Sequence, residues 1–259
     1  PFVGLHAHSV AGSIFDGLGY PQEHMDFAYE NGMDALALTD HGNMNGLAWQ
    51  VLHAKKMQAE GKDFKPIFGC EAYFVPSIKE WHEDYEKIME DKKAARAENF
   101  YRYPRLDFDL LEKYNEGIIA SSACLGGVYA GCYWESRDDG PEAVISAMRA
   151  VTERMVDIFG DRWYGELQWN NIPEQHELNK YIIQVCEEYN VDMISTADSH
   201  YPNPDAWRDR ELYKRLGWLG KGRPSWGGDG ELPIDVDEIG YELYPKNGDQ
   251  MWESYKKYS

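Results

Sequence analysis

The sequence has few cysteines and no long apolar run, and we expect no secretory leader. Four cysteines are spread over 259 residues, too few for the disulfide framework of a secreted protein, so we expect reduced thiols and a cytoplasmic location. No segment approaches the roughly 18 uninterrupted apolar residues of a membrane-spanning helix. The first residues lack the basic and apolar stretches of a leader peptide. The sequence therefore predicts no membrane association.

Basic residues are also scarce. The 26 Lys and Arg residues against 45 Asp and Glu residues give a formal net charge of −19. Because non-specific DNA affinity comes mostly from neutralised phosphates, this charge excludes a broad basic face that grips a duplex. It leaves open a small phosphate ester, or a strand end held by metal ions. Residues 207–223 are a local exception with six basic and two acidic side chains, a balance suited to following a single strand.

Short apolar segments alternate with helical patterns, which predicts an α/β protein with a parallel sheet covered on both faces. We expect a main domain over residues 1–219 and a C-terminal extension over 220–259, packed on that domain or leading to another. Strands are expected at 2–5, 35–38, 66–75, 118–121, 164–167 and 193–196. Helices are expected at 21–31, 45–60, 81–98, 107–114, 142–159, 173–189 and 205–216.

Side chains capable of binding metal ions lie at or just beyond the C-terminal ends of five expected strands. They are His6 and His8, Asp40 and His41, Glu71, Cys124, and Asp198 with His200. Residues i and i+2 of a strand point to the same side, so each His-x-His or Asp-x-His pair can reach one ion. The carboxyl ends of parallel strands meet at one face of a barrel. Such a cluster is unfavourable in a protein interior unless cations lie among its charges.

Each of these pieces alone has an ordinary structural explanation. Asp40 suits the N-cap of a helix, Glu71 suits a salt bridge, and Cys124 suits a small buried apolar site. Their combination at five strand ends predicts a multinuclear metal site. Imidazole, carboxylate and one thiolate favour Zn²⁺, Mn²⁺ or Fe²⁺ over Ca²⁺ or Mg²⁺, which prefer oxygen ligands.

Five motifs carry a resemblance to a known family. They are HAHS (His6–Ser9), LTDHGNM (Leu38–Met44), PIFGCE (Pro66–Glu71), SSACLGG (Ser121–Gly127) and TADSHY (Thr196–Tyr201). In this order they resemble the PHP (polymerase and histidinol phosphatase) superfamily. DGL (Asp16–Leu18) and ELQWNNIPEQ (Glu166–Gln175) resemble the branch at the N-terminus of bacterial DNA polymerase III alpha subunits. The resemblance implies a distorted (β/α)7 TIM-like barrel, with two or three divalent ions (Zn, Mn or Fe) at the C-terminal ends of the strands.

The resemblance also implies a ligand set. His6, His8, Glu71 and Asp198 would surround one ion, Glu71 would bridge to a second ion held by Cys124, and Asp40, His41 and His200 would hold a third. The polymerase branch has one further histidine in an HLTLLA-like segment, and here the charged stretch 79–99 stands in its place. His82, the one histidine of that stretch, either replaces the missing ligand or faces solvent from a helix.

Phosphoester hydrolysis by a metal-bridging hydroxide is the implied chemistry, with Glu71 holding the ions and Asp40 or His200 carrying protons. Arg102 and Arg105 lie among aromatic residues, where they either bind the substrate phosphate or pair with surface carboxylates. The favoured hypothesis is a 3′–5′ exonuclease or phosphodiesterase that acts on single-stranded DNA ends beside a replicative polymerase domain or subunit. The alternatives are a small-molecule phosphatase of the histidinol-phosphate or nucleotide type, and a non-catalytic structural PHP module of a polymerase.

Overall fold

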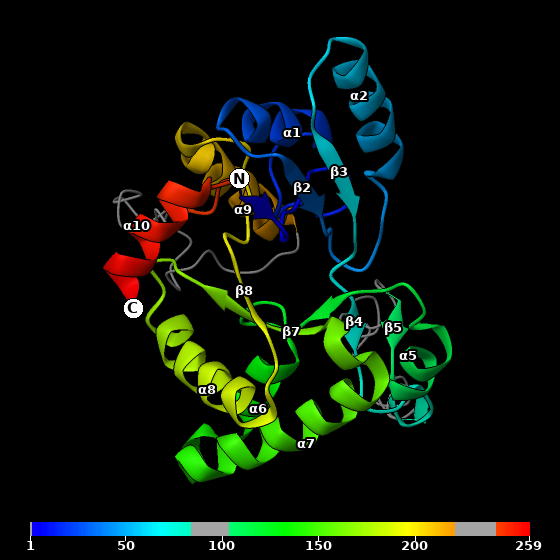
Figure 1. Cartoon of the computed structure of the whole chain (residues 1–259), viewed down its shortest axis with the longest axis vertical. Helices are drawn as coiled ribbons and strands as arrows, with labels where there is room; N and C mark the ends of the chain where they lie inside the picture. The colour runs from blue at the N-terminus through cyan, green and yellow to red at the C-terminus, as the bar shows by residue number, and fades with distance from the viewer. Residues whose placement is uncertain (1, 84–103, 221–241) are drawn as a thin grey trace.

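Short parallel strands alternate with helices along the chain in the computed structural model, which describes residues 2–83, 104–220 and 242–259 (Figure 1). The fold is mixed α/β, as expected. The strands are β1 (Val3–Gly4), β2 (Ala35–Leu38), β3 (Lys65–Phe68), β4 (Tyr73–Phe74), β5 (Arg105–Leu106), β6 (Ala120–Ser121), β7 (Trp163–Gln168) and β8 (Met193–Thr196).

The strands form three parallel sheets in the orders β1-β2-β3, β4-β5 and β6-β7-β8. Single bridges between Ala7 and Ser199 and between His41 and Glu71 extend the pairing beyond the strand ends. The described residues therefore do not form the closed (β/α)7 barrel that was expected. The named strands of the three sheets are not paired with one another.

Helices cover the sheets on their outer sides. They are α1 (Pro21–Glu30), α2 (Leu47–Ala59), α5 (Phe108–Tyr114), α6 (Val128–Ser136), α7 (Pro141–Phe159), α8 (Pro173–Tyr189), α9 (Trp207–Gly220) and α10 (Gly248–Tyr258). In Figure 1, α1 and α2 lie beside β1–β3, while α6, α7 and α8 lie beside β6–β8. Each group of helices packs on its sheet through its own cluster of buried apolar side chains.

Local sequence explains where the main helices begin and end. α7 starts with a proline at its first position, after Gly140, and ends at Gly160, and both glycines have positive φ. Its buried residues include Val144, Met148 and Thr152, four residues apart, which form a stripe toward the core. At α10 the Asn247 side chain accepts a hydrogen bond from the Gln250 backbone N–H, as expected of an N-cap.

Several predicted elements differ from the structure. The expected strand 66–75 is divided into β3 and β4 by the segment that carries Glu71. α6 was not predicted, because Gly131 and its mixed side chains give no clear amphipathic period. Of the expected helix 81–98, residues 81–83 are helical and the remainder lies outside the described residues.

The described part of the predicted C-terminal extension contacts the rest of the fold. Met251 of α10 belongs to the core cluster of β7 and α8. The His176 ring contacts the carbonyl oxygen of Tyr258 at 2.6 Å, and Leu243 N donates to the Tyr201 hydroxyl at 2.7 Å. The domain boundary at 219/220 stays a prediction. Within the described residues, every helix is too short or too polar to cross a bilayer.

Candidate metal centre

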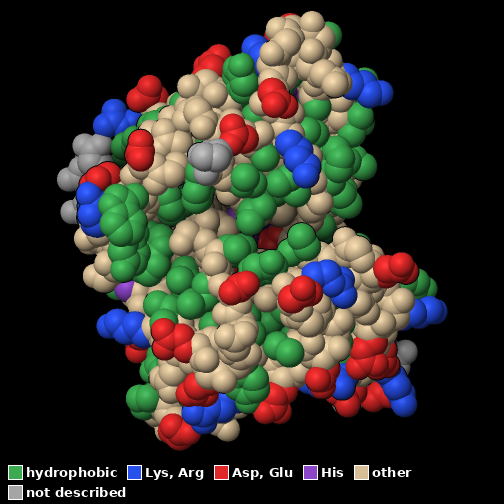
Figure 2. Space-filling model, viewed as in Figure 1, with side chains coloured by type: hydrophobic (Ala, Val, Ile, Leu, Met, Phe, Trp, Pro, Cys, Tyr) green, Lys and Arg blue, Asp and Glu red, His purple; other side chains and the backbone are tan. Residues whose placement is uncertain are grey.

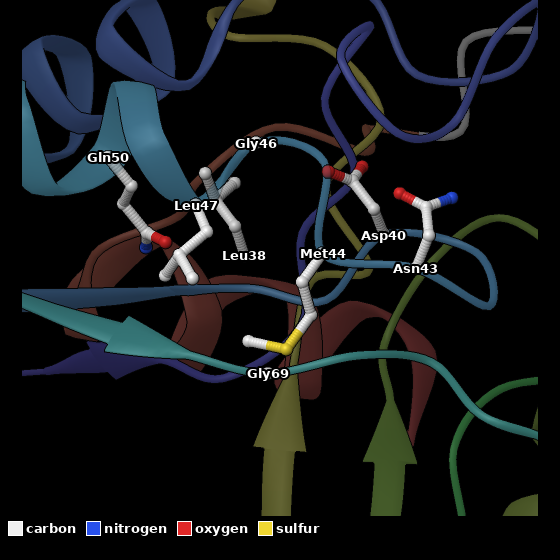
Figure 3. Close-up of a pocket in the computed structure, with 8 residues that line it drawn as sticks. All are labelled: Leu38, Asp40, Asn43, Met44, Gly46, Leu47, Gln50 and Gly69. Carbon is white, nitrogen blue, oxygen red and sulfur yellow. The ribbon is translucent and has the colours of Figure 1, made fainter.

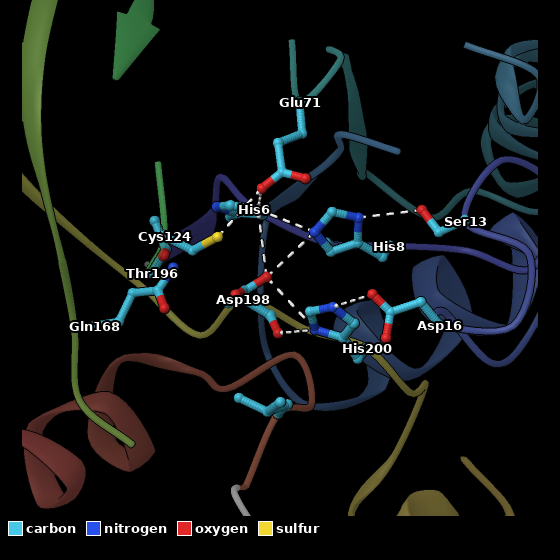
Figure 4. Close-up of polar contacts among 12 residues, drawn as sticks. His6, His8, Ser13, Asp16, Glu71, Cys124, Gln168, Thr196, Asp198 and His200 are labelled. Atoms are coloured by element: carbon cyan, nitrogen blue, oxygen red, sulfur yellow. Dashed lines mark hydrogen bonds and ion pairs between the residues drawn. The ribbon is translucent and has the colours of Figure 1, made fainter. Parts of the chain in front are cut away.

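Two buried imidazoles face each other just beyond the end of β1. His6 Nδ1 donates to Glu166 Oε1 at 2.6 Å, and His8 Nδ1 donates to Ser13 Oγ at 3.1 Å. The two Nε2 atoms consequently point to one place and lie 3.0 Å apart (Figure 4). Because a hydrogen bond at one ring nitrogen leaves the other for coordination, Nε2 is the atom of each ring that is available to a metal ion.

Two carboxylates converge on the same place from β3 and β8. Asp198 Oδ1 lies 3.3 Å from His6 Nε2 and 3.2 Å from His8 Nε2, and Glu71 Oε1 lies 3.6 Å from His6 Nε2. Asp198 Oδ1 is buried and, among the described residues, accepts no hydrogen bond of normal geometry. A buried carboxylate oxygen without a hydrogen bond is unfavourable, and a cation beside the two Nε2 atoms would compensate it.

A second group of donors adjoins the first. Ligand atoms of His8, His41 and His200 lie within 4.8 Å of one another. Asp16 Oδ2 lies 2.8 Å from His41 Nε2 and 3.3 Å from His200 Nε2. His200 Nδ1 donates to the Asp198 carbonyl oxygen at 2.7 Å, which leaves its Nε2 facing Asp16. Since His8 also belongs to the group of His6 and Glu71, the two groups form one continuous cluster.

Glu71 connects the two groups. Its Oε1 lies 3.3 Å from Cys124 Sγ, on the side of His6, while its Oε2 is hydrogen-bonded to His41 Nδ1. Gly126 N donates to Cys124 Sγ at 3.4 Å, which turns the sulfur toward the carboxylate. One carboxylate with an oxygen on each side of the cluster has the arrangement needed to bridge two ions.

Backbone strain lies beside two of these side chains. Asp198 has φ 48° and Ala123, which precedes Cys124, has φ 59°. Such conformations cost about 1–3 kcal/mol in a non-glycine residue and are concentrated at functional sites. Here they aim the Asp198 carboxylate and the Cys124 thiol into the cluster.

Glu166 of β7 is a buried carboxylate that the sequence analysis did not assign. It accepts hydrogen bonds from His6 Nδ1 and Thr196 Oγ1, both at 2.6 Å, and from Ser121 Oγ at 2.6 Å. This network fixes the tautomer and orientation of the His6 ring. The motif ELQWNNIPEQ contained the signal, but an acidic residue inside an apolar strand was not interpreted as part of the site.

Asp40 lies apart from the donor groups. Its carboxylate accepts from Ser9 N at 2.6 Å, from Ser9 Oγ at 2.8 Å and from Ser13 Oγ at 2.8 Å. It lines a small pocket with Asn43 and Gly46 (Figure 3). Beside His41 and His200, where the sequence analysis expected Asp40, the structure brings Asp16. Asp40 and His41 are adjacent, so their side chains leave the chain in different directions, and Asp40 holds the loop that carries Ser9 and Ser13.

Of the other predicted site residues, His82 and Arg105 are described and belong to neither donor group. His82 is exposed, and its ring contacts that of Trp81 at 5.0 Å. Among the described residues it belongs to neither donor group. Arg102 falls outside the described residues. The Arg105 guanidinium stacks 4.9 Å from the ring of Tyr73, its cross-strand partner, and that ring lies 6.3 Å from His41.

Two imidazoles of the cluster have raised pKa values. Burial lowers the pKa of His41, but hydrogen bonds to Asp16 and Glu71 outweigh it and raise the pKa to about 10. Burial likewise opposes a charge on His6, yet Asp198 and Glu166 raise its pKa well above the ordinary value. Protons on these two rings therefore balance the surrounding carboxylates.

The pKa values of His8, Glu71 and Cys124 are also shifted. Burial and the neighbouring His200 lower the pKa of His8 to about 4, so this ring is neutral. Burial would raise the pKa of Glu71, but His41 and His6 hold it well below its usual range. Burial, together with Asp198 and Glu71, raises the pKa of the Cys124 thiol. A divalent ion would reverse that shift, since a coordinating thiol is deprotonated.

The cluster opens to solvent at one end. The Asp16 side chain is 33% exposed, against 14% for Glu71, while His8 is fully buried. Figure 2 shows the surface hollowed between the half that contains α1 and α2 and the half that contains α6–α8, with an acidic side chain at its base. The partly exposed Asp16 side chain is therefore the part of the cluster that a small charged group can reach.

The donor set fits two or more divalent cations. Imidazole nitrogens, carboxylate oxygens and one sulfur converge, and in the described part of the chain the buried Asp198 Oδ1 accepts no hydrogen bond. This mixture is the ligand chemistry of zinc, manganese or iron, and it fits calcium or magnesium less well.

Comparison with known families agrees with this arrangement. A family model for the PHP domain matches residues 4–170. The chain belongs to the PHP family. The matched residues include β2–β7 together with Glu71, Cys124 and Glu166, while Asp198 and His200 follow them in the chain.

Relatives of this PHP chain include DNA polymerase III alpha subunits. It is 36% identical over 228 residues to the DNA polymerase III subunit alpha of Aquifex aeolicus (strain VF5), a match that covers 79% of the chain and 18% of that protein. It is 31% identical over 273 residues to the same subunit of Borreliella burgdorferi, with 98% and 22% covered. The chain thus spans about a fifth of the length of these relatives.

A solved PHP-like structure overlaps more loosely. The histidinol phosphate phosphatase of Lactococcus lactis, complexed with zinc, L-histidinol and phosphate, has a TM-score of 0.45 and 13% sequence identity. The overlap covers 85% of this chain and 94% of that one. A similarity at this level says nothing further about the chain.

Proposed function

We propose that this PHP domain is a metal-dependent phosphodiesterase that removes nucleotides from the 3′ end of single-stranded DNA. The observation that carries the proposal is the convergence of His6 Nε2 and His8 Nε2 with Asp198 Oδ1, and of His6 Nε2 with Glu71 Oε1. Divalent ions held there would supply positive charge against a phosphate group and lower the pKa of a water molecule. The similarity to polymerase III alpha subunits supports DNA as the substrate.

The chain's own residues divide the work in this proposal. His6, His8, Asp198, Glu71 and Cys124 hold ions in the buried part of the cluster. His41, His200 and Asp16 hold one at the solvent-exposed end, where Asp16 takes the place that the sequence analysis gave to Asp40.

Two of the catalytic roles expected from the sequence are therefore reassigned. His200 donates from Nδ1 to a carbonyl oxygen, so its Nε2 serves as a ligand and the ring carries no proton to substrate. Asp40 accepts three hydrogen bonds from the loop that contains Ser9 and Ser13. We assign it the positioning of that loop.

Side chains at the solvent-exposed end of the cluster suit the binding of a DNA strand. The Tyr73 ring lies between His41 and the Arg105 guanidinium, and Arg105 also stacks 5.3 Å from the Trp81 ring. Aromatic rings with a guanidinium stack on bases without regard to sequence and attract phosphates. The chain's net charge of −19 opposes DNA, so binding should be local and salt-sensitive, and assisted by a polymerase domain or subunit.

The decisive assay compares two kinds of phosphoester. With Mn²⁺ or Zn²⁺, the 259-residue chain should shorten 5′-labelled single-stranded DNA from its 3′ end, and a small phosphomonoester should react far more slowly. His6→Ala should abolish this shortening of the DNA. His53→Ala should retain it, because His53 pairs with Asp26 outside the cluster. Faster hydrolysis of the phosphomonoester would make the domain a small-molecule phosphatase, and no turnover by the metal-loaded chain would make it a structural module.

Metal binding should depend on pH through the rings that carry protons. The raised pKa of His41 stabilises the metal-free fold fully below pH 6.5, and this contribution is lost as the pH rises toward about 10. Metal ions must displace the protons of His41 and His6, so their affinity should increase over the same range. Thermal unfolding from pH 6.5 to 8.5 should show the stabilisation by Mn²⁺ growing with pH.

Calorimetry in buffers of different ionisation enthalpy should then detect protons released as Mn²⁺ binds. The variant His41→Gln should release fewer. Binding without proton release would contradict a cluster in which protons take the place of cations.

A further inference from the structure

A buried arginine of α9 lies directly behind Asp16. Arg210 is 5% exposed. Its Nη2 donates to Asp16 Oδ1 at 2.5 Å, and its Nε donates to the Asp16 main-chain carbonyl oxygen at 2.9 Å. One guanidinium therefore holds both the backbone and the carboxylate of a single residue, although the two residues lie 194 positions apart in the chain.

This hold leaves one carboxylate oxygen directed at the cluster. Because Asp16 Oδ1 is bonded to Arg210, Oδ2 is the oxygen that faces His41 Nε2 at 2.8 Å and His200 Nε2 at 3.3 Å. A free aspartate side chain would rotate among several positions. A carboxylate fixed by a forked guanidinium presents one oxygen in one direction.

The charges behind Asp16 are balanced. Arg210 Nη1 donates to Glu211 Oε1 at 3.3 Å, and Lys214 Nζ lies 3.6 Å from the same oxygen. The positive charges of Arg210 and Lys214 therefore face the carboxylates of Asp16 and Glu211. The three donating nitrogens of Arg210 are all engaged within the protein, an arrangement that suits holding Asp16 and leaves little for gripping a substrate phosphate.

The preceding residue is held by the same helix. Phe15 has φ 64°, a strained conformation for a large side chain. Its ring lies 5.2 Å from that of Tyr213, and a Cβ added at Gly217 would come within 2.5 Å of the Phe15 side chain. Contacts from α9 thus fix two consecutive residues, one strained and one facing the cluster.

We propose that Arg210 is a positioning residue of the metal centre, which acts through Asp16 to form the ion position next to His41 and His200. This inference rests on the proposed function, since it requires that the cluster bind metal. It also explains part of the basic segment 207–223: Arg210 and Lys214 face acidic side chains of the protein, so the segment is less able to follow a DNA strand than its composition indicated.

Titration of the 259-residue chain with Mn²⁺ tests the inference. Substituting Arg210→Met should weaken the most weakly held ion about 10- to 100-fold, the range found for residues that orient a ligand. Arg210→Lys keeps the charge but cannot make both contacts to Asp16. Its affinity for the most weakly held ion should therefore lie between those of Arg210→Met and the wild type. Arg149→Met is the matched control, because Arg149 pairs with Glu142 and Glu188 on the surface of α7 and α8, and its ion affinities should equal those of the wild type.

Wild-type affinity for every ion in a folded Arg210→Met, verified by near-UV circular dichroism, would overturn the inference. So would unchanged ion affinities with a tenfold higher KM for the phosphoester, which would place Arg210 on the substrate. If Arg210→Met does not fold, Arg210→Lys decides on the same criteria. If the wild type itself binds no Mn²⁺, the proposed metal centre fails and this inference fails with it.

Discussion

Glu71→Ala is expected to remove two metal ions with one substitution. The carboxylate has Oε1 beside His6 and Cys124 and Oε2 against His41, so both halves of the cluster lose a ligand. Phosphoester hydrolysis should fall by a factor on the order of a thousand, because the charge stabilisation supplied by metal ions is worth several kcal/mol and each 1.4 kcal/mol is tenfold in rate. Elemental analysis of the purified variant measures the loss directly.

The control for this substitution is Glu112→Ala. Glu112 pairs with Arg154 at 2.6 Å on the surface and should change neither ion content nor rate. Loss of a single ion from Glu71→Ala would show that the carboxylate serves one position, and an unchanged content would exclude it from the metal centre.

Glu166→Ala is expected to destabilise the metal-free fold by about 3–5 kcal/mol, the usual effect of removing one member of a buried ion pair. Burial would raise the pKa of Glu166, but His6 and the hydroxyls of Ser121 and Thr196 lower it. The substitution leaves these donors buried without an acceptor and frees the His6 ring to rotate. Urea unfolding in the presence of a chelator measures the loss of stability.

Glu166→Gln separates the two roles of this residue. The amide fills the same volume and can still accept one hydrogen bond, so the fold should lose less stability than in Glu166→Ala. Metal affinity should nevertheless fall about 10- to 100-fold, because the amide orients the His6 ring less strongly. If neither substitution lowers metal affinity, Glu166 supports the fold alone.

The strand-end histidines could be predicted from the sequence because their pattern is local. His6 and His8, and Asp198 and His200, are i, i+2 pairs that follow short apolar strands, and the structure brings them together where parallel strands end. The same reasoning located Glu71 and Cys124. This prediction required only the expected end of each strand and the direction in which its side chains point.

Asp16 and Glu166 could not be assigned in this way. Asp16 lies in an irregular loop whose course is determined by distant contacts, above all with Arg210 on α9. Glu166 lies within β7, where a carboxylate is tolerated because it accepts hydrogen bonds from neighbouring strands. Tertiary contacts of this kind are absent from local patterns. For Asp40 the local sequence favoured a metal ligand, but tertiary contacts give the side chain another role. Its carboxylate accepts hydrogen bonds from Ser9 and Ser13.

The sheet arrangement was predicted more coarsely than the site. Alternation of apolar runs and helical patterns indicated parallel strands, and these are present. Closure into a barrel depends on the lateral pairing of short strands such as β4 and β5. These strands have two residues each, and a sequence pattern of that length does not predict which strands pair.

The most direct test is a crystal structure of the 259-residue chain grown with Mn²⁺ or Zn²⁺, with anomalous scattering measured at the metal edge. The account predicts two or three anomalous peaks within the cluster. One should lie about 2.0–2.2 Å from the Nε2 atoms of His6 and His8 and from an oxygen of Asp198. Ordered water without anomalous signal among those three side chains, in crystals saturated with metal, would contradict it.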